Sequence, residues 1–261
     1  MQQQGQITDD GKVNFPDKVQ MSIERLQYFE PEEGYYLAFS GGKDSIVIYD
    51  LAVKAGVKFD AHYNLTTVDP PELVRFIKQE YPGVERHRPE LNMWQLIVKN
   101  GGPPSRLMRY CCRVLKEGGG TGRLAVTGIR AAESSKRAGR RMVENCLSDG
   151  TKTFLHPIID WTDTEIWQYI RQNGIKYCSL YDEGFKRLGC IMCPMGNTRN
   201  MEREAKRWPR IYNLYLKSFG RVIEKRRDKG TLKDWETAED LMHWWIYNPP
   251  KGDPDQGVLF E

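Results

Sequence analysis

The sequence lacks any long apolar run, any internal repeat and any low-complexity segment. A membrane-spanning helix needs about 18 or more apolar residues in a row, so we do not expect one. Residues 1–5 lack the basic and then apolar pattern of a secretion signal, and we therefore expect a cytoplasmic protein. The 261 residues, 39% hydrophobic and 28% charged, suit one α/β domain with an additional lobe.

The chain also lacks a strong excess of charge, because its formal net charge is only +4. The charges are unevenly placed. Residues 186–229 contain 13 Lys/Arg and 4 Asp/Glu, whereas residues 231–261 contain 2 and 7. From Arg199 onward the pattern is helical, basic and rich in Trp and Tyr, with the aromatics predicted to be mostly core. The basic segment is either a solvated helix face or a surface for a polyanion such as nucleic acid.

The first strong motif is an apolar run, residues 35–39, that leads into two glycines and then a helix over about 44–55. Glycines let the backbone turn tightly and approach a ligand. The first amides of the helix have no partner within it and favour an anion such as phosphate. The predicted phosphate site comprises Ser40, Gly41, Gly42, Lys43, Asp44 and Ser45, with Asp44 placed to hold Mg²⁺. The alternative is a glycine turn that caps an ordinary helix.

Strands alternate with helices along the rest of the first two hundred residues. Strands are expected over 58–65, 83–89, 123–130 and 153–159, and helices over 21–29, 71–81, 91–100 and 161–173. Residues 1–20 are expected to be a loose arm. This order predicts an α/β fold with a doubly wound, mostly parallel sheet covered on both faces. We divide the chain into an arm and helix (1–30), a nucleotide-binding domain (31–198) and a helical C-terminal region (199–261).

Two further segments carry candidate binding residues. Thr67 and Asp69 follow the second strand and would line the nucleotide pocket at the carboxyl edge of the sheet, although Asp69 could equally cap the next helix. Gly128, Arg130 and Arg137 follow a later strand, and the two arginines could grip a phosphate or sulfate bidentately. The alternative for this second segment is a solvated basic loop.

Four of the six cysteines form a candidate metal-binding group. Cys111 and Cys112 are adjacent, and 77 residues separate them from the pair Cys190 and Cys193. Adjacent cysteines bridge each other poorly, and a reducing compartment disfavours disulfides. Four thiolates from two segments suit Zn²⁺ or an iron–sulfur cluster, while inert core thiols are the remaining interpretation. The other two, Cys146 and Cys178, are expected to be packing residues.

Together these motifs resemble a known family. Residues 40–45 do not have the spacing of a Walker A loop. They resemble the pyrophosphate loop of the N-type ATP pyrophosphatases, which have an adenine nucleotide alpha hydrolase-like fold. The phosphoadenylyl-sulfate (PAPS) reductase family shares that fold. The cysteine spacing is similar to the [4Fe–4S] motif of bacterial adenylyl-sulfate reductases. Segments 127–137, 156–162 and 180–190 also resemble this family, so the resemblance covers about residues 35–196. It implies a bound adenine nucleotide, either ATP or a sulfonucleotide, with Mg²⁺ and a [4Fe–4S] cluster.

One residue that the resemblance leads us to expect is missing, the cysteine nucleophile of the reductases. Assimilatory reductases of the family end in a tail whose cysteine attacks the sulfate sulfur, and this chain has no cysteine after Cys193. Three readings follow. The chain is an iron–sulfur ATP pyrophosphatase, with Lys43 and Asp44 as catalytic residues, that adenylates a nucleic-acid or small-molecule acceptor and needs a sulfur donor. Alternatively, it is a sulfonucleotide reductase that uses a small thiol or a partner protein as reductant, or a nucleotide-binding module without turnover.

Overall fold

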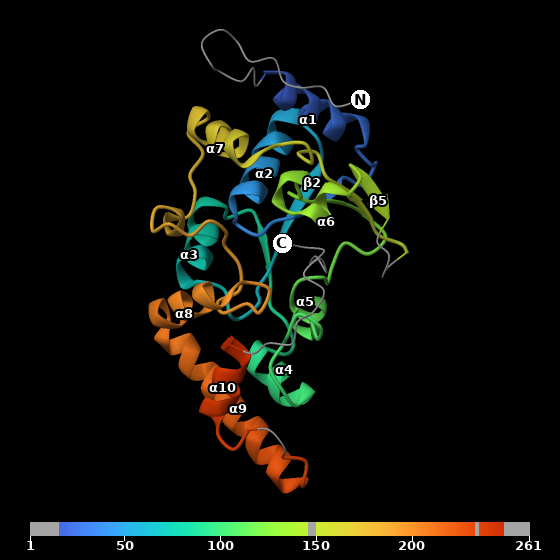
Figure 1. Ribbon diagram of the computed structural model, residues 1–261. Coiled ribbons are helices and arrows are strands. Elements are labelled where there is room, and N and C mark those ends of the chain that lie inside the picture. The colour runs from blue at the N-terminus through green and yellow to red at the C-terminus, as the bar shows by residue number, and fades with distance from the viewer. Residues whose placement is uncertain (1–15, 146–149, 233–234, 248–261) are drawn as a thin grey trace. The chain divides into compact units, whose positions relative to one another are not determined.

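The computed structural model describes residues 16–145, 150–232 and 235–247 (Figure 1). Two compact units interleave along the chain. The first takes in the described parts of residues 1–62, 83–85 and 120–177, and the second those of residues 63–82, 86–119 and 178–261. The consecutive domains predicted from the sequence are a different division. Both cysteine segments belong to the same unit as the C-terminal helices, which that division does not anticipate.

A six-stranded sheet has the order β3-β2-β1-β4-β6-β5. Its strands are β1 (Tyr35–Ala38), β2 (Phe59–Asn64), β3 (Glu85–His87), β4 (Leu124–Val126), β5 (Val143–Asn145) and β6 (Thr153–Leu155). The pairs β1–β2, β1–β4 and β4–β6 are parallel, and β5 is antiparallel to β6 at the edge. The predicted α/β fold with a mostly parallel sheet is confirmed. The short edge strand β5 was not predicted.

The centre of the sheet explains the apolar run that begins the phosphate motif. Tyr35 and Leu37 of β1 are completely buried, and β1 has a parallel neighbour on each side. Strands inside a parallel sheet are buried on both faces and therefore read as continuous apolar runs. The loop that follows β1 thus starts from the most constrained strand of the sheet.

The first unit contains the helices α1 (Pro16–Tyr28), α2 (Lys43–Ala55), α6 (Ser135–Ala138) and α7 (Asp163–Gln172), with a 3₁₀ turn η1 (Ala131–Glu133). Helices α1 and α7 both pack against α2. The prediction of a loose arm over residues 1–20 is wrong for residues 16–20, which form the beginning of α1. Helix α7 begins with a capping box formed by Thr162 and Glu165.

The second unit contains α3 (Pro71–Glu80), α4 (Met93–Asn100), α5 (Tyr110–Leu115), the 3₁₀ turn η2 (Ser179–Tyr181), α8 (Thr198–Arg207), α9 (Pro209–Asp228) and α10 (Ala238–Tyr247). Helix α9 packs against α4, α8 and α10. Trp245 lies 4.9 Å from Tyr215 and 5.4 Å from Phe219 between ring centroids, so aromatic residues form the core between these helices. Among the described helices, none is long and apolar enough to cross a bilayer.

Candidate functional site

The loop between β1 and α2 has the backbone that its glycines predict. Gly41 has a φ of 72°, in the left-handed region that favours glycine. Gly42 is the N-cap residue of α2, and no side chain caps this helix. The first amides of α2 lie at the positive end of the helix dipole and lack a side-chain acceptor, which is the arrangement that binds an anion.

Two serine hydroxyls fold this loop upon itself. Ser40 Oγ accepts a hydrogen bond from the amide of Gly42 at 3.3 Å and donates to Ser45 Oγ at 3.2 Å. Ser45 Oγ in turn donates to the carbonyl oxygen of Gly42 at 2.9 Å. Ser45 is buried and Ser40 is exposed. Ser40 is therefore the hydroxyl of the pair that a ligand can reach.

Four charged side chains meet beside the loop. Lys43 Nζ lies 3.3 Å from Asp44 Oδ2 and 3.2 Å from Asp163 Oδ1. Arg130 places Nε 2.7 Å from Asp44 Oδ1 and Nη2 3.1 Å from Asp163 Oδ1. The side chains of Lys43 and Arg130 are only 3% and 2% exposed, whereas that of Asp163 is 64% exposed. Two buried cations are thus bridged by the same two carboxylates, one of which faces solvent.

Gly128 follows β4 and lies against the start of α2. A Cβ added at residue 128 would lie 3.0 Å from the carbonyl carbon and from the Cβ of Asp44. A contact this short is tighter than most Cβ contacts in proteins, so Asp44 would have to shift by a few tenths of an ångström. Glycine at 128 therefore allows the loop after β4 to approach Asp44 closely, and so places Arg130 beside it.

The loop after β4 is tied together by Glu133. Glu133 Oε2 accepts a hydrogen bond from the backbone amide of Arg130 at 3.0 Å, and the Glu133 carboxylate also pairs with Arg137. Arg137 is buried, and its amide donates to Ser134 Oγ at 3.3 Å at the start of α6. Both arginines predicted to grip an anion thus have carboxylate partners in this structure. Anion binding by them stays a prediction.

Thr67 and Asp69 belong to the second unit, in the turn that follows β2. Asp69 accepts hydrogen bonds from the amide and the hydroxyl of Thr66, both at 2.7 Å. The N-cap residue of α3 is Pro70, without a side-chain cap, so the alternative that Asp69 caps this helix is wrong. Thr67 has a φ of 66°, which is rare for a β-branched residue, and its Oγ1 accepts from the amide of Met93 at 2.9 Å. Contact of this turn with a nucleotide stays a prediction.

The structure brings the four predicted cysteine ligands into one region of the second unit. Cys111 and Cys112 lie in α5, and Cys111 is near enough to interact electrostatically with Cys112, Cys190 and Cys193. The buried Tyr215 of α9 interacts in the same way with Cys190, Cys111 and Cys193. All four are free thiols. As predicted, Cys178 is a buried packing residue; Cys146 lies outside the described residues.

The turn between the second pair of cysteines is held in place by backbone contacts. The amide of Ile191 donates to Val68 O at 2.9 Å, and the hydroxyl of Tyr215 donates to Ile191 O at 3.1 Å. Met192 is buried, has a φ of 58°, and donates its amide to the carboxylate of Glu204. The protein therefore orients the two thiols on either side of this turn through its own packing.

Basic side chains alter the charge of the vicinal cysteine pair. A hydrogen bond from Cys111, together with nearby Lys116 and Arg109, lowers the pKa of the Cys112 thiol to about 6. The same hydrogen bond and burial raise the pKa of the Cys111 thiol. Burial raises the pKa of Cys190 to about 11. Four thiols, one of them readily ionised, form a donor set that fits a thiophilic metal centre.

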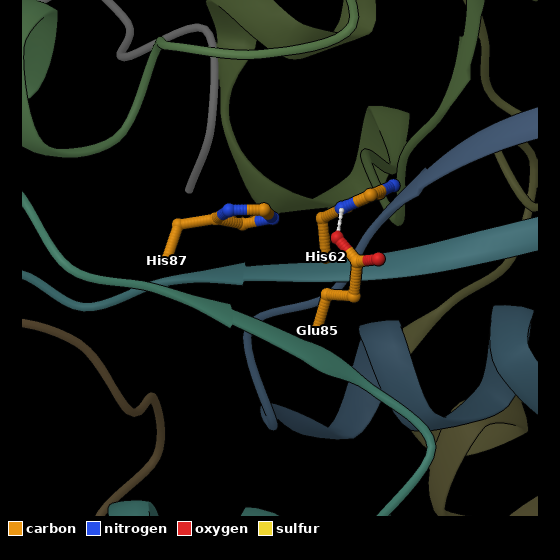
Figure 2. A group of neighbouring side chains, drawn as sticks. All are labelled: His62, Glu85 and His87. Carbon is orange, nitrogen blue, oxygen red and sulfur yellow. Dashed lines mark ion pairs between the residues drawn. The ribbon is translucent and has the colours of Figure 1, made fainter.

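A histidine and a carboxylate pair with each other on strands of the sheet. Figure 2 shows His62 of β2 with its Nδ1 3.3 Å from Glu85 of β3. The other ring nitrogen of His62 contacts Asp60, and the ring stacks on Tyr36 with centroids 4.1 Å apart. Both nitrogens of His62 thus have carboxylate partners within the first unit. His87 of β3 is exposed.

A mostly parallel sheet whose central strand runs into a glycine loop and an uncapped helix defines a class of nucleotide-binding α/β proteins. The phosphoadenosine phosphosulfate reductase domain matches residues 34–196, and the chain belongs to this family. The resemblance inferred from the motifs is thereby confirmed for the family and for the fold.

Three comparisons show what this chain is similar to. The chain is 26% identical to the uncharacterized protein MJ0066 of Methanocaldococcus jannaschii over 90% of its own length and 51% of that protein, so it spans about half of that relative. It is 28% identical to adenosine 5'-phosphosulfate reductase of Oceanobacillus iheyensis over 66% of its own length and 75% of that enzyme. The crystal structure of phosphoadenylyl-sulfate reductase from Candida auris has a TM-score of 0.51 at 18% identity, covering 72% of this chain and 98% of that one.

Sequence reasoning missed two carboxylates of the nucleotide-loop region. Asp163 lay only at the start of the helix expected over 161–173, and Glu133 was not singled out. Asp163 lies 33 residues from Arg130, which it contacts, and no local pattern distinguishes it from an ordinary first-turn acid. Glu133 has a weak signal, since it lies four residues before Arg137 and can pair with it across one turn.

Proposed function

We propose that the chain is an ATP pyrophosphatase that adenylates a substrate for sulfur transfer. The observation that supports this most is the placement of two buried cations, Lys43 and Arg130, beside the uncapped start of α2. A polyphosphate carries several negative charges, and fixed amides and cations are the groups that bind it and stabilise it as a leaving group. A loop that merely capped a helix would have no need of buried cations.

In the proposed reaction, an oxygen of the substrate attacks the α-phosphorus of ATP. The bond between that phosphorus and the bridging oxygen of the leaving group breaks, and pyrophosphate departs with the electron pair. Lys43 and the amides of residues 41–45 stabilise the charge that develops on the pyrophosphate. Asp44 would hold Mg²⁺, because its carboxylate is 20% exposed and each oxygen retains a lone pair beside its cation partner. Bound Mg²⁺ would supply further neutralisation of the phosphates.

We also propose that Cys111, Cys112, Cys190 and Cys193 hold a [4Fe–4S] cluster. The donor set supports this, since four free thiols from two segments lie in one unit, with Lys116 and Arg109 beside them. With all four cysteines as ligands, a bound cluster would supply electrons; it would carry sulfide for the reaction only if one iron lacked a cysteine ligand. Zn²⁺ is the alternative occupant of the same thiols.

A second candidate function is reduction of a sulfonucleotide, favoured by the named relatives that are adenosine 5'-phosphosulfate reductases. In this case Arg130 and Arg137 would hold the sulfonucleotide, and an external thiol would attack its sulfur. A nucleotide-binding module without turnover is the third. All three require an adenine nucleotide at the loop of residues 40–45.

The test uses anaerobically purified protein with labelled ATP and, separately, with adenylyl sulfate and a thiol reductant. Pyrophosphate release, or a tight ATP complex that awaits its acceptor, supports the first function. Sulfite release supports the second, and binding of adenylyl sulfate alone with no product supports the third. Lys43→Met should weaken nucleotide binding, while Lys58→Met, an exposed lysine just before β2, should leave it unchanged. If the wild type binds neither nucleotide, all three proposals fail.

A further inference from the structure

Helices α8 and α9 carry a set of cations that the protein does not use for its own structure. Five are exposed and have no ion pair or hydrogen bond within the part of the chain that the structure describes. They are Arg199, Lys206, Arg210, Lys217 and Arg221, which we call the basic face.

Other cations of the same helices are committed to structure. Arg207 pairs with Glu183 at 2.9 Å and with Glu72 at 3.0 Å. Arg226 donates twice to the carbonyl oxygen of Gly101, at 3.0 and 2.6 Å. The basic face is therefore a distinct subset, left over after the structural requirements of the fold are met.

Three members of the basic face lie along one side of α9. Arg210, Lys217 and Arg221 are separated by seven and four residues, which places them within about 20° of one line along the helix. The buried residues Tyr215 and Phe219 lie on the other side. At about 1.5 Å per residue, the line extends for about 16 Å. A strand of nucleic acid with about 3.4 Å of rise per phosphate presents several phosphates over that length.

The nearby carboxylates do not neutralise this face. Glu202 accepts a hydrogen bond from the hydroxyl of Tyr247 at 2.7 Å, and Glu204 accepts from the amide of Met192. Two exposed acids, Glu224 and Asp228, follow Arg221 in the final turns of α9. The cations of the last turn of α9, Lys225, Arg226 and Arg227, donate hydrogen bonds to backbone carbonyl oxygens. The basic face therefore lies in α8 and in the part of α9 between Arg210 and Arg221.

The basic face also lacks the apolar partner surface that membrane binding requires. An interfacial helix buries an apolar face in the lipid while its cations meet the headgroups. Among the described residues, no large hydrophobic side chain of α8 or α9 is highly exposed. The apolar face of α9 is already buried against α4 and α10. A polyanion that needs only charges and hydrogen-bond donors fits this surface better than a lipid bilayer does.

We propose that the basic face binds the phosphodiester backbone of a nucleic acid. The contact is made by phosphates, so we expect weak dependence on base sequence and strong dependence on salt. The inference does not depend on the reaction proposed above, since it rests on a different set of residues.

The test measures binding of the protein to a labelled single strand of about 20 nucleotides, as RNA and as DNA, and to the corresponding duplexes over a series of salt concentrations. The variant Arg210→Gln/Lys217→Gln/Arg221→Gln removes three charges from the line. The control Arg75→Gln/Lys78→Gln/Lys99→Gln removes the same charge from exposed positions of the same unit. For single strands, each phosphate contact contributes about 0.7 to the slope of log affinity on log salt, so the test variant should lose about 2 in slope and about tenfold or more in affinity.

The control should keep both its slope and most of its affinity. The test variant should keep the unfolding midpoint and the ATP binding of the wild type, which separates this proposal from the proposed reaction. The proposal is overturned if the wild type binds none of the probes, or if both triple variants weaken binding equally. It is also overturned if polyglutamate displaces the nucleic acid as well as unlabelled nucleic acid does, or if phosphatidylserine vesicles bind through the same residues while nucleic acid does not.

Discussion

Asp44 and Arg130 are 86 residues apart, yet Asp44 Oδ1 accepts a hydrogen bond from Arg130 Nε at 2.7 Å. This contact joins the first turn of α2 to the loop after β4. Two motifs that look independent in the sequence, the loop of residues 40–45 and the segment that contains Gly128, Arg130 and Arg137, therefore meet through one ion pair. The arginine is almost fully buried while it makes this pair, so its charge depends on Asp44 and Asp163 for compensation.

We expect Arg130→Ala to destabilise the first unit by about 2 kcal/mol. Removing one partner of a buried ion pair commonly costs about 3–5 kcal/mol, and the partial exposure of both carboxylates reduces this. The free energy of unfolding from urea titrations measures the effect. Lys136→Ala, at an exposed position of α6, is the control and should change stability by about 0.5 kcal/mol or less. Equal losses in the two variants would contradict the prediction.

We expect Asp163→Asn to strengthen the binding of an anion at the loop. The substitution removes the exposed carboxylate that shares Lys43 and Arg130, and so leaves the site more positive. We expect the affinity for pyrophosphate, measured by calorimetry at low salt, to increase about three- to tenfold. Removal of one negative charge from a partly solvated site has an effect of this size. Glu90→Gln, an exposed acid of the second unit, controls for the change in net charge. Weaker pyrophosphate binding would show instead that Asp163 positions the two cations.

Gly128→Ala should destabilise the protein by about 1–3 kcal/mol, because the new Cβ overlaps the backbone of Asp44. Gly139→Ala provides a matched control, since its Cβ would meet only Lys136 O at 3.7 Å and its φ of −83° suits any residue. That control should be neutral or slightly stabilising. Thermal unfolding of both variants checks the prediction, and a stable Gly128→Ala protein would argue against the close approach.

Stability should fall with acidification below about pH 6.5 because of His156. The Nδ1 of His156 lies 2.7 Å from Thr127 Oγ1, and its Nε2 lies 3.1 Å from Glu144. Burial lowers the pKa of His156, and the nearby Arg140 and Arg137 lower it further. Glu144 acts in the opposite direction, but the pKa remains below its ordinary value. Below the unfolded-state pKa of about 6.5, the unfolded chain binds a proton that the folded chain resists. The unfolding free energy should therefore decrease by up to about 1.4 kcal/mol per pH unit in that range.

The variant His156→Gln should be less stable overall but should lose this slope between about pH 6.5 and 5. Because the pKa of Glu144 is lowered, this residue also decreases the unfolding free energy as the pH falls, but only near and below its ordinary pKa of 4.5. The contributions of His156 and Glu144 therefore occur in separate pH ranges. His243→Gln, at an exposed position of α10, is the control. Urea titrations at several pH values give the slopes, and an unchanged slope in His156→Gln would refute the assignment.

Serine substitution of any one of Cys111, Cys112, Cys190 and Cys193 should reduce the iron content of anaerobically purified protein and its broad absorbance near about 400 nm. Cys178→Ala is the control, because Cys178 is a buried packing residue of the same unit. Chelation of the metal should lower the melting temperature, since metal binding contributes to folding free energy. Wild-type protein that contains zinc without iron would favour the alternative metal centre, and protein with neither metal would exclude both.

Local sequence was sufficient to predict those parts of the molecule whose structure depends on neighbouring residues. The strand, glycine loop and helix around residues 35–55 follow from an apolar run, left-handed glycine and helix periodicity. The helix expected over 161–173 likewise corresponds to α7. By contrast, β5 is only three residues long and forms because β6 offers it an edge, so its own sequence does not specify it.

The sequence by itself determined the family, the alternation of strands and helices, and the chemical types of the candidate ligands, because these depend on patterns within a few residues or on ordered motifs. Only the tertiary structure decided that Asp163 shares Lys43 and Arg130, that both cysteine segments lie in one unit with α9, and that Thr67 is strained. Those relationships arise from long-range packing, in which side chains distant in the chain compensate each other's charge and burial, and no local pattern encodes them.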